Sequence, residues 1–219
     1  SYGTVTPTSV ITMTGNSFAL PTPTASTGYT VVGSWYTDSA LTSNAKAYGT
    51  SYTPSSSITL YSSATINDPA TPTITRTSGA ETTIYGATDV VLTCATTTTY
   101  ASGTSIYYLF GYATSDGGTP GNWTTAGTAN TTSISATAYV GDRYYSCRVY
   151  ASDGTQTSST VTSAASADTL MRINNATITF DATTNGGTIS GTTPLYTRSG
   201  VAGLYTGIRN STAGTIPTA

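Results

Sequence analysis

The chain has 219 residues, of which only 7% are charged, and its net charge is −2 with no histidine. This length allows two domains of about 100 residues each. The slightly acidic balance offers nucleic acid no basic face, and the lack of histidine removes the commonest general base. The chain contains no run of about 18 apolar residues, the length needed to span a bilayer.

Residue usage predicts an all-β protein. Thr, Ser, Tyr and Val, which suit strands and turns, prevail over Leu, Glu and Lys, which fill helices, and no stretch has sustained helical spacing of apolar residues. Disorder is not expected, because disordered chains combine few aromatic residues with high charge, and this chain has 17 tyrosines. The near absence of lysine and other charges, which usually protect exposed sheet edges, indicates a surface that neighbouring copies cover.

The first predicted domain, residues 1–66, contains three strand-like stretches. They are Phe18–Thr24, Gly28–Thr37 and Ile58–Tyr61. The Asp68–Pro72 segment that follows has the composition of a linker.

The middle domain, residues 67–168, is predicted as a sandwich of short strands separated by regular turns. The expected strands cover residues 90–94, 106–110, 132–136 and 141–150, the last with clean alternation of apolar and polar positions. Asp116, Asp142 and Asp153 each adjoin glycine and are predicted to be turn residues.

The last domain, residues 169–219, begins with the strand-like Thr177–Asp181. A glycine turn at Asn185–Gly187 follows, and Thr215–Ala219 ends the chain.

The first and last domains resemble two halves of the internalin-type B-repeat, found in tandem on secreted bacterial surface proteins. Residues 178–190 match its first half with an insertion at 182–184, and residues 20–37 match its second half, in which Val31 replaces an aromatic residue and Ser34 is inserted. The resemblance covers under half of the chain and implies β-grasp-like half-repeats in reversed order. Alternatively, both ends are ordinary β-rich segments that share turn residues.

The middle domain resembles a bacterial immunoglobulin-like domain. Cys94 and Cys147 lie 53 residues apart, Tyr145 stands two residues before the second cysteine, and the Ser115–Trp123 stretch also fits. The resemblance implies a Cys94–Cys147 disulfide across two sheets, which suits a secreted chain; the alternative is two reduced, buried cysteines. The expected architecture is therefore an immunoglobulin-like sandwich flanked by β-grasp-like half-repeats, at an extracellular, cell-surface location.

Catalysis is not expected. Nucleophile–histidine pairs are impossible here, the nine carboxylates are scattered without a calcium-loop pattern, and the cysteines suit a disulfide better than zinc. The sequence therefore predicts a protein that is not an enzyme and that needs no metal or cofactor.

Two kinds of modification or ligand site remain open. N-x-T/S sequons occur at Asn122, Asn130, Asn175 and Asn210, although several are expected by chance in a chain so rich in threonine. The aromatic pairs at 35–36, 107–108 and 144–145 could stack on sugar rings, or could simply fill the core.

Three functions fit these observations. The first is a secreted structural subunit that polymerises head to tail, residues 177–219 of one copy completing the first domain of the next by strand addition. The second is a segment of a repetitive adhesin stalk that binds protein or carbohydrate, expected if Ser1 and Ala219 are not the native ends. The third is a carbohydrate-binding module, for which cell-wall or surface glycans would be the partners.

The polymer hypothesis places apolar side chains from both ends in one joint. The last domain is expected to contribute Ile178, Phe180, Ile189, Leu195, Leu204 and Ile216. The first domain is expected to contribute Leu20, Tyr29, Val31, Trp35 and Leu60.

Overall fold

A computed structural model of the chain describes residues 3–4, 14–164, 170–174, 176–178 and 195–197. These residues form strands, turns and loops without any helix, which confirms the all-β prediction for the part described. The chain divides into two compact units. Unit 1 contains residues 1–71, 96–107 and 149–161, and unit 2 contains residues 72–95, 108–148 and 162–219.

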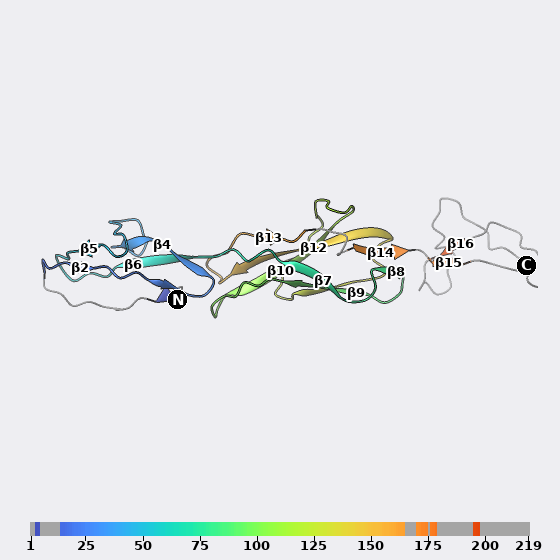
Figure 1. The fold of residues 1–219 in the computed structure, drawn as a ribbon, viewed down its shortest axis with the longest axis horizontal. Coiled ribbons are helices and arrows are strands. Elements are labelled where there is room, and N and C mark those ends of the chain that lie inside the picture. Colours follow the sequence, from blue (N-terminus) through green and yellow to red (C-terminus); the bar gives the residue numbers. More distant parts are fainter. Residues whose placement is uncertain (1–2, 5–13, 165–169, 175, 179–194, 198–219) are drawn as a thin grey trace, which may run out of the picture. The chain divides into compact units, whose positions relative to one another are not determined.

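Unit 1 is built from antiparallel strand pairs (Figure 1). Its strands are β1 (Gly3–Thr4), β2 (Phe18–Ala19), β3 (Thr24–Ala25), β4 (Tyr29–Tyr36), β5 (Ser51–Tyr52) and β6 (Tyr61–Ile66). β1 pairs with β3, β2 with β5, and β4 with β6. The β4–β6 register places Tyr29 opposite Ile66 and shifts between Val32 and Tyr36, next to Gly33, whose φ is +79°.

A small apolar core closes unit 1. Tyr29, Ala64, Ile66 and Ala151 form its buried cluster, and Tyr100 packs against it. Segments 96–107 and 149–161, which the sequence analysis assigns to the middle domain, therefore share a core with residues of the predicted first domain, 1–66.

Unit 2 contains two larger sheets and a separate two-stranded pair. Its own strands are β7 (Thr73–Ser78), β8 (Thr82–Ile84), β9 (Val90–Ala95), β11 (Thr131–Ile134), β14 (Leu170–Asn174), β15 (Ala176–Ile178) and β16 (Leu195–Thr197). Three strands contribute residues to both units: β10 (Ser105–Ala113), β12 (Gly141–Ser152) and β13 (Val161–Thr162).

The strand order is β11-β9-β7 in one sheet and β10-β12-β14-β8 in the other, with β13 also paired to β12. β14 runs parallel to β8 and antiparallel to β12. β15 and β16 form a separate antiparallel pair.

Alternation explains how the two sheets bury a core. Along β9, Val90, Leu92 and Cys94 are buried while the residues between them are half-buried, as a pleated strand requires. Met171 and Ile173 of β14 are fully buried in the same way. The predicted strands at 90–94, 106–110, 132–136 and 141–150 are confirmed, within one residue at each start and within one to three residues at each end.

The disulfide prediction is confirmed. Cys94 of β9 and Cys147 of β12 are bonded, with Cα atoms 6.1 Å apart, and neither is exposed. Since β9 and β12 belong to different sheets, the bond joins the two layers of the sandwich.

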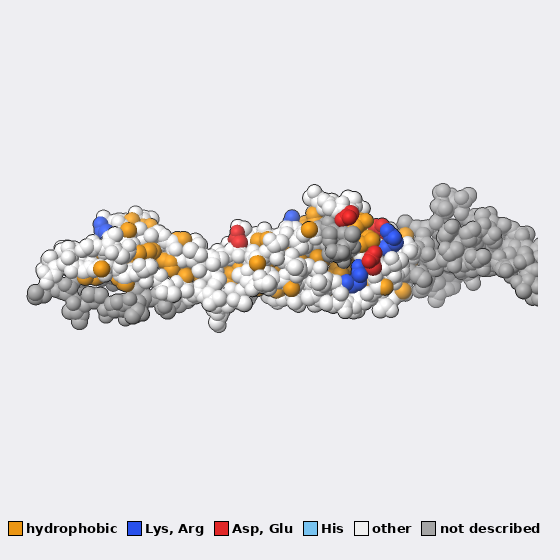
Figure 2. Space-filling view, viewed as in Figure 1, with side chains coloured by type: hydrophobic (Ala, Val, Ile, Leu, Met, Phe, Trp, Pro, Cys, Tyr) orange, Lys and Arg blue, Asp and Glu red, His pale blue; other side chains and the backbone are white. Residues whose placement is uncertain are grey.

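One turn prediction is wrong. Asp142 lies within β12, where its carboxylate forms a salt bridge of 2.7 Å with Arg172 of β14. Asp116 and Asp153 do occupy bends or loops. On the face shown in Figure 2, charged side chains gather near β12 and β14 of unit 2.

Candidate functional site

Tyr29 is the central side chain of a hydrogen-bonded joint within unit 1, formed by Tyr29, Tyr100, Asp153 and Gln156 and distinct from the predicted contact between copies. Its ring lies in the apolar cluster, and its hydroxyl lies 2.7 Å from Thr104 Oγ1. The same hydroxyl donates to Asp153 Oδ2 at 2.8 Å. One tyrosine thus connects β4 with the loop before β10 and with the turn after β12.

Asp153 organises that turn. Its Oδ1 accepts the backbone N–H groups of Thr155 at 2.8 Å and Gln156 at 2.7 Å, while Gly154 adopts a φ of +86°. The hydrogen bond from the Gln156 N–H, followed by that from Thr155, holds the pKa of the Asp153 carboxyl below its usual value. The carboxylate is therefore occupied by the turn and by Tyr29.

Gln156 binds the edge of β6 as another strand would. Its Nε2 donates to the carbonyl of Ala64 at 2.9 Å, and its Oε1 accepts the N–H of Ile66 at 3.1 Å. Close by in sequence, the Ser159 N–H donates to Asp68 Oδ1 at 2.7 Å. These bonds satisfy backbone groups that would otherwise be left open at a sheet edge.

Tyr100 completes the joint. Its hydroxyl donates to the carbonyl of Asn67 at 2.8 Å, and its ring occupies the space where a Cβ at Gly28 would lie. Burial, together with the charges of Asp68 and Tyr29, raises the pKa of Tyr100 to about 12. Gly28 itself has a φ of +82°, so both its backbone and its neighbour require glycine.

The first-domain residues predicted for the contact between copies differ in how far the chain itself buries them. Leu20, Tyr29 and Trp35 are only 2%, 7% and 8% exposed, so the chain itself covers them, and Trp35 Nε1 donates to the carbonyl of Pro21 at 2.8 Å. Val31 and Leu60 are half-buried.

The predicted partners from the last domain are less completely placed. Ile178 and Leu195 are opposite each other in the backbone register of β15 and β16. Phe180, Ile189, Leu204 and Ile216 lie outside the described residues. The pairing of the two groups between copies stays a prediction.

Exposed apolar side chains lie at the start of β6 and just before it, next to backbone groups that no described residue pairs with. Ile58 and Tyr61 are the large hydrophobic residues exposed in the described part, at 44% and 40%. Because the Ala64 carbonyl and the Ile66 N–H point away from β4 toward Gln156, alternation directs the backbone groups of Ser62 the same way. No described residue pairs with them.

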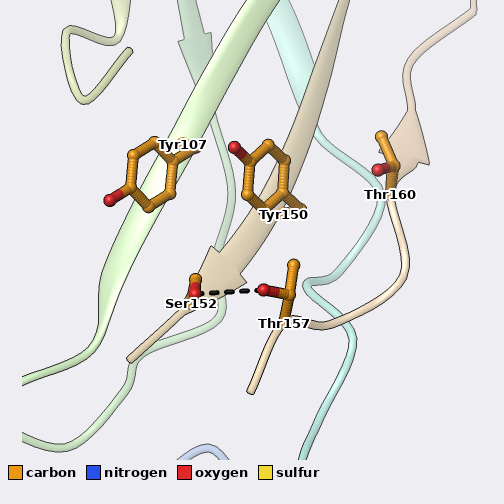
Figure 3. A pocket seen from close by; sticks show the side chains of 5 residues that line it. All are labelled: Tyr107, Tyr150, Ser152, Thr157 and Thr160. Atoms are coloured by element: carbon orange, nitrogen blue, oxygen red, sulfur yellow. Dashed lines mark hydrogen bonds between the residues drawn. The ribbon is translucent and has the colours of Figure 1, made fainter. Parts of the chain in front are cut away.

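An open hollow of about 370 Å³ lies elsewhere in unit 1 (Figure 3). It is lined by Tyr107, Tyr150, Ser152, Thr157 and Thr160. The two tyrosine rings are parallel within 8°, with centroids 5.0 Å apart. Sequence reasoning singled out Tyr107 but missed Tyr150, which comes beside it only through the pairing of β10 with β12.

In unit 2, arginines lie over aromatic rings. Arg143 lies 3.9 Å from the ring centres of both Tyr112 and Tyr139, and Arg148 lies 4.0 Å from that of Trp123. These contacts use the cations for packing rather than leaving them open to ligands.

The sequons are exposed where they are described. Asn122 and Asn130 are at the surface, and Asn122 has a φ of +51°. Asn175 and Asn210 lie outside the described residues. Glycosylation stays a prediction.

The described residues contain neither a metal-binding cluster nor a membrane-spanning helix. No group of three or more His, Cys, Asp or Glu residues lies close enough there to hold a metal ion. Within the same residues, no helix has the length and apolarity to cross a membrane. Compared with protein-family models, curated proteins and solved structures, the chain matches none of them.

Proposed function

We propose that this chain is a secreted structural subunit of an extracellular bacterial surface filament. Its last segment, residues 177–219, adds to the β6 edge of the next copy. The observation that carries this proposal is that edge: no described residue pairs with the outward backbone groups of Ser62, which directly follows the exposed Tyr61. Ile58, just before the strand, is exposed as well. An open edge with apolar side chains and without lysine is a template for strand addition.

The contact would be head to tail, because the edge and the added segment are different surfaces. Such a contact does not close on itself and extends into a fibre. The resemblance of residues 178–190 and 20–37 to two halves of one B-repeat supports the same pairing.

An immunoglobulin-like fold for the middle domain is part of the proposal. Taking β9 and β12 as strands B and F, the orders β11-β9-β7 and β10-β12-β14 correspond to E-B-A and C-F-G. The Cys94–Cys147 bond between B and F supports this assignment and suits an oxidising, extracellular compartment.

The role proposed is mechanical and needs no catalysis. The joint at Tyr29, Asp153 and Gln156 fastens the first segment to the turns next to β10 and β12. This joint would serve equally in a segment of an adhesin stalk, which is the second candidate function. The two candidates differ in whether the chain polymerises by itself.

Assembly of the purified chain, followed by sedimentation velocity and electron microscopy, tests the proposal. Ser62→Pro removes the outward N–H without touching the β4 pairing, and proline is tolerated on edge strands. Ser133→Pro is the matched control, because the Ser133 N–H also points outward, from the β11 edge in unit 2. We expect Ser62→Pro to prevent polymers and Ser133→Pro to permit them.

A mixing experiment identifies the partner segment. Phe180→Asp should block the last segment while leaving the β6 edge intact, so neither it nor Ser62→Pro should polymerise alone. Their mixture retains one good edge and one good segment, and should form dimers and nothing larger. A wild-type chain that stays monomeric at high concentration would refute the filament and favour the stalk.

A further inference from the structure

The hollow of unit 1 combines aromatic rings with hydroxyl groups. Its wall contains Tyr107 and Tyr150, and its other lining residues are Ser152, Thr157 and Thr160 (Figure 3). None of the five carries a charge. At about 370 Å³ it is near the lower end of the size range of small-molecule sites, and it is open to solvent.

The two rings leave part of their faces available. Parallel rings in full face-to-face contact would be ~3.5–4 Å apart, the optimal distance between carbon atoms. Since the centroids are 5.0 Å apart and the planes differ by 8°, the rings are offset, and neither covers the other completely. Figure 3 shows them side by side above Ser152 and Thr157.

Several hydroxyls of the hollow are open to a ligand. No described residue makes a hydrogen bond to the hydroxyl of Tyr107, Tyr150 or Thr160. Ser152 and Thr157 are held in place by a hydrogen bond of 3.1 Å between their Oγ atoms. The Ser152 and Thr157 side chains are therefore held in place, while the other hydroxyls of the hollow are neutral donors and acceptors without a described partner.

The nearest acidic group in sequence is not available to a ligand. Both carboxylate oxygens of Asp153 are engaged, one by Tyr29 and the other by backbone N–H groups of the turn. A charged ligand would thus lose its hydration at the hollow without gaining an ionic partner.

We infer that this hollow binds a pyranose unit of a neutral polysaccharide. The C–H face of a sugar ring is apolar and packs on the uncovered tyrosine faces, while its hydroxyls exchange hydrogen bonds with Tyr107, Tyr150 and Thr160. The open side allows the polymer to continue beyond the bound unit. This assignment does not depend on whether the chain polymerises, although repeated sites in a filament would add avidity.

Affinity electrophoresis of the full chain tests the inference. The gels contain hydroxyethyl cellulose, galactomannan or dextran as neutral polymers, polygalacturonate as an anionic one, or no polysaccharide. Mobility in each gel is divided by mobility in the gel without polysaccharide, which removes the effect of assembly. We expect retardation by at least one neutral polymer, insensitive to added salt.

Variants locate the binding site. Tyr150→Ala should weaken the retardation at least tenfold, with the fold checked by circular dichroism. Thr160→Arg, at an exposed position on the rim, should abolish it without altering either ring. Thr125→Arg is the matched control, because it makes the same change at an exposed threonine of unit 2, and it should bind like the wild type.

Three results would overturn the assignment. They are retardation by no neutral polymer, retardation by polygalacturonate alone, and equal retardation of the wild type and Thr160→Arg. Binding of poly-L-proline without binding of any sugar would assign the hollow to extended peptides and would equally overturn it.

Discussion

The hydroxyl of Tyr29 donates to Oδ2 of Asp153 at 2.8 Å, joining residues 124 positions apart in the sequence. Tyr29 belongs to the Gly-Tyr motif of the B-repeat resemblance, and the polymer hypothesis places it in a contact between copies. In the structure, the same motif ties β4 to segments 96–107 and 149–161 of its own chain. Long-range hydrogen bonds of unit 1 to Thr104 and Asp153 therefore depend on a motif at the start of β4.

Removing the Tyr29 hydroxyl tests that dependence. Tyr29→Phe keeps the ring in the apolar cluster but leaves Asp153 and Thr104 without their partner. We expect the thermal midpoint to fall and residues 14–66 to become more sensitive to limited proteolysis. Tyr52→Phe is the control, because its ring packs on Phe18 away from the joint. Equal effects of the two substitutions would contradict the role of Tyr29.

The joint should weaken in acid. The Asp153 carboxyl has a folded pKa below its usual 3.8, chiefly because the Gln156 N–H bonds to it. A carboxyl group whose pKa is lower in the folded state than in the unfolded state stabilises the fold. This stabilisation is complete at pH values above the unfolded-state pKa and is lost as the pH falls through the folded-state pKa. Urea unfolding from pH 7 to pH 2 should show a decline below about pH 4 that Asp153→Asn reduces. An unchanged pH profile in that variant would show that Asp153 is not responsible.

Gly28 should not tolerate a side chain. A Cβ there would overlap the Tyr100 ring, and its φ of +82° disfavours any L-residue. Gly49 has a similar φ of +74°, but no atom lies within 4 Å of the place that a Cβ would take there, so Gly49→Ala isolates the backbone cost of about 1–2 kcal/mol. Gly28→Ala should cost more than Gly49→Ala in chemical denaturation. Equal costs would mean that Tyr100 moves aside freely.

Gln156 should stabilise unit 1 through both the Nε2 and the Oε1 atom of its side-chain amide. Gln156→Ala leaves the Ala64 carbonyl and the Ile66 N–H without partners, at a cost of about 1–3 kcal/mol for each group that stays buried. Gln156→Glu keeps an acceptor for Ile66 but loses the donor to Ala64. Hydrogen exchange at the Ile66 amide should therefore accelerate strongly in Gln156→Ala and less in Gln156→Glu. Unchanged exchange in both variants would contradict the edge contact.

Local pattern and spacing predicted some parts of this fold and missed others. Alternation predicts β12, and the resemblance to an immunoglobulin-like domain predicts the Cys94–Cys147 bond. The turn prediction for Asp142 is wrong because glycine beside aspartate is a turn signal, whereas its partner Arg172 is 30 positions away. The short, polar β8 has no clear strand pattern, and its parallel pairing with β14 depends on a long-range register.

The candidate sites also depend on contacts between residues far apart in the sequence, which local patterns do not predict. Tyr107 stood out as half of an aromatic pair with Tyr108, yet its partner in the hollow is Tyr150, which lies on another strand. Gln156 lies in a Ser- and Thr-rich stretch and has no sequence signal at all. Its role arises only because the turn at Asp153 places its side chain beside β6.

The disulfide should be a large single contribution to the stability of unit 2. It joins residues 53 positions apart, for which the chain-entropy model gives a stabilisation of about 4 kcal/mol. Measured stabilisations are often smaller. Replacing both Cys94 and Cys147 by alanine should lower the free energy of unfolding by about 2–5 kcal/mol. Thiol titration of the denatured, non-reduced wild type should find no free thiol. Two reactive thiols in that titration, or a double variant as stable as the wild type, would contradict the bond between the two sheets.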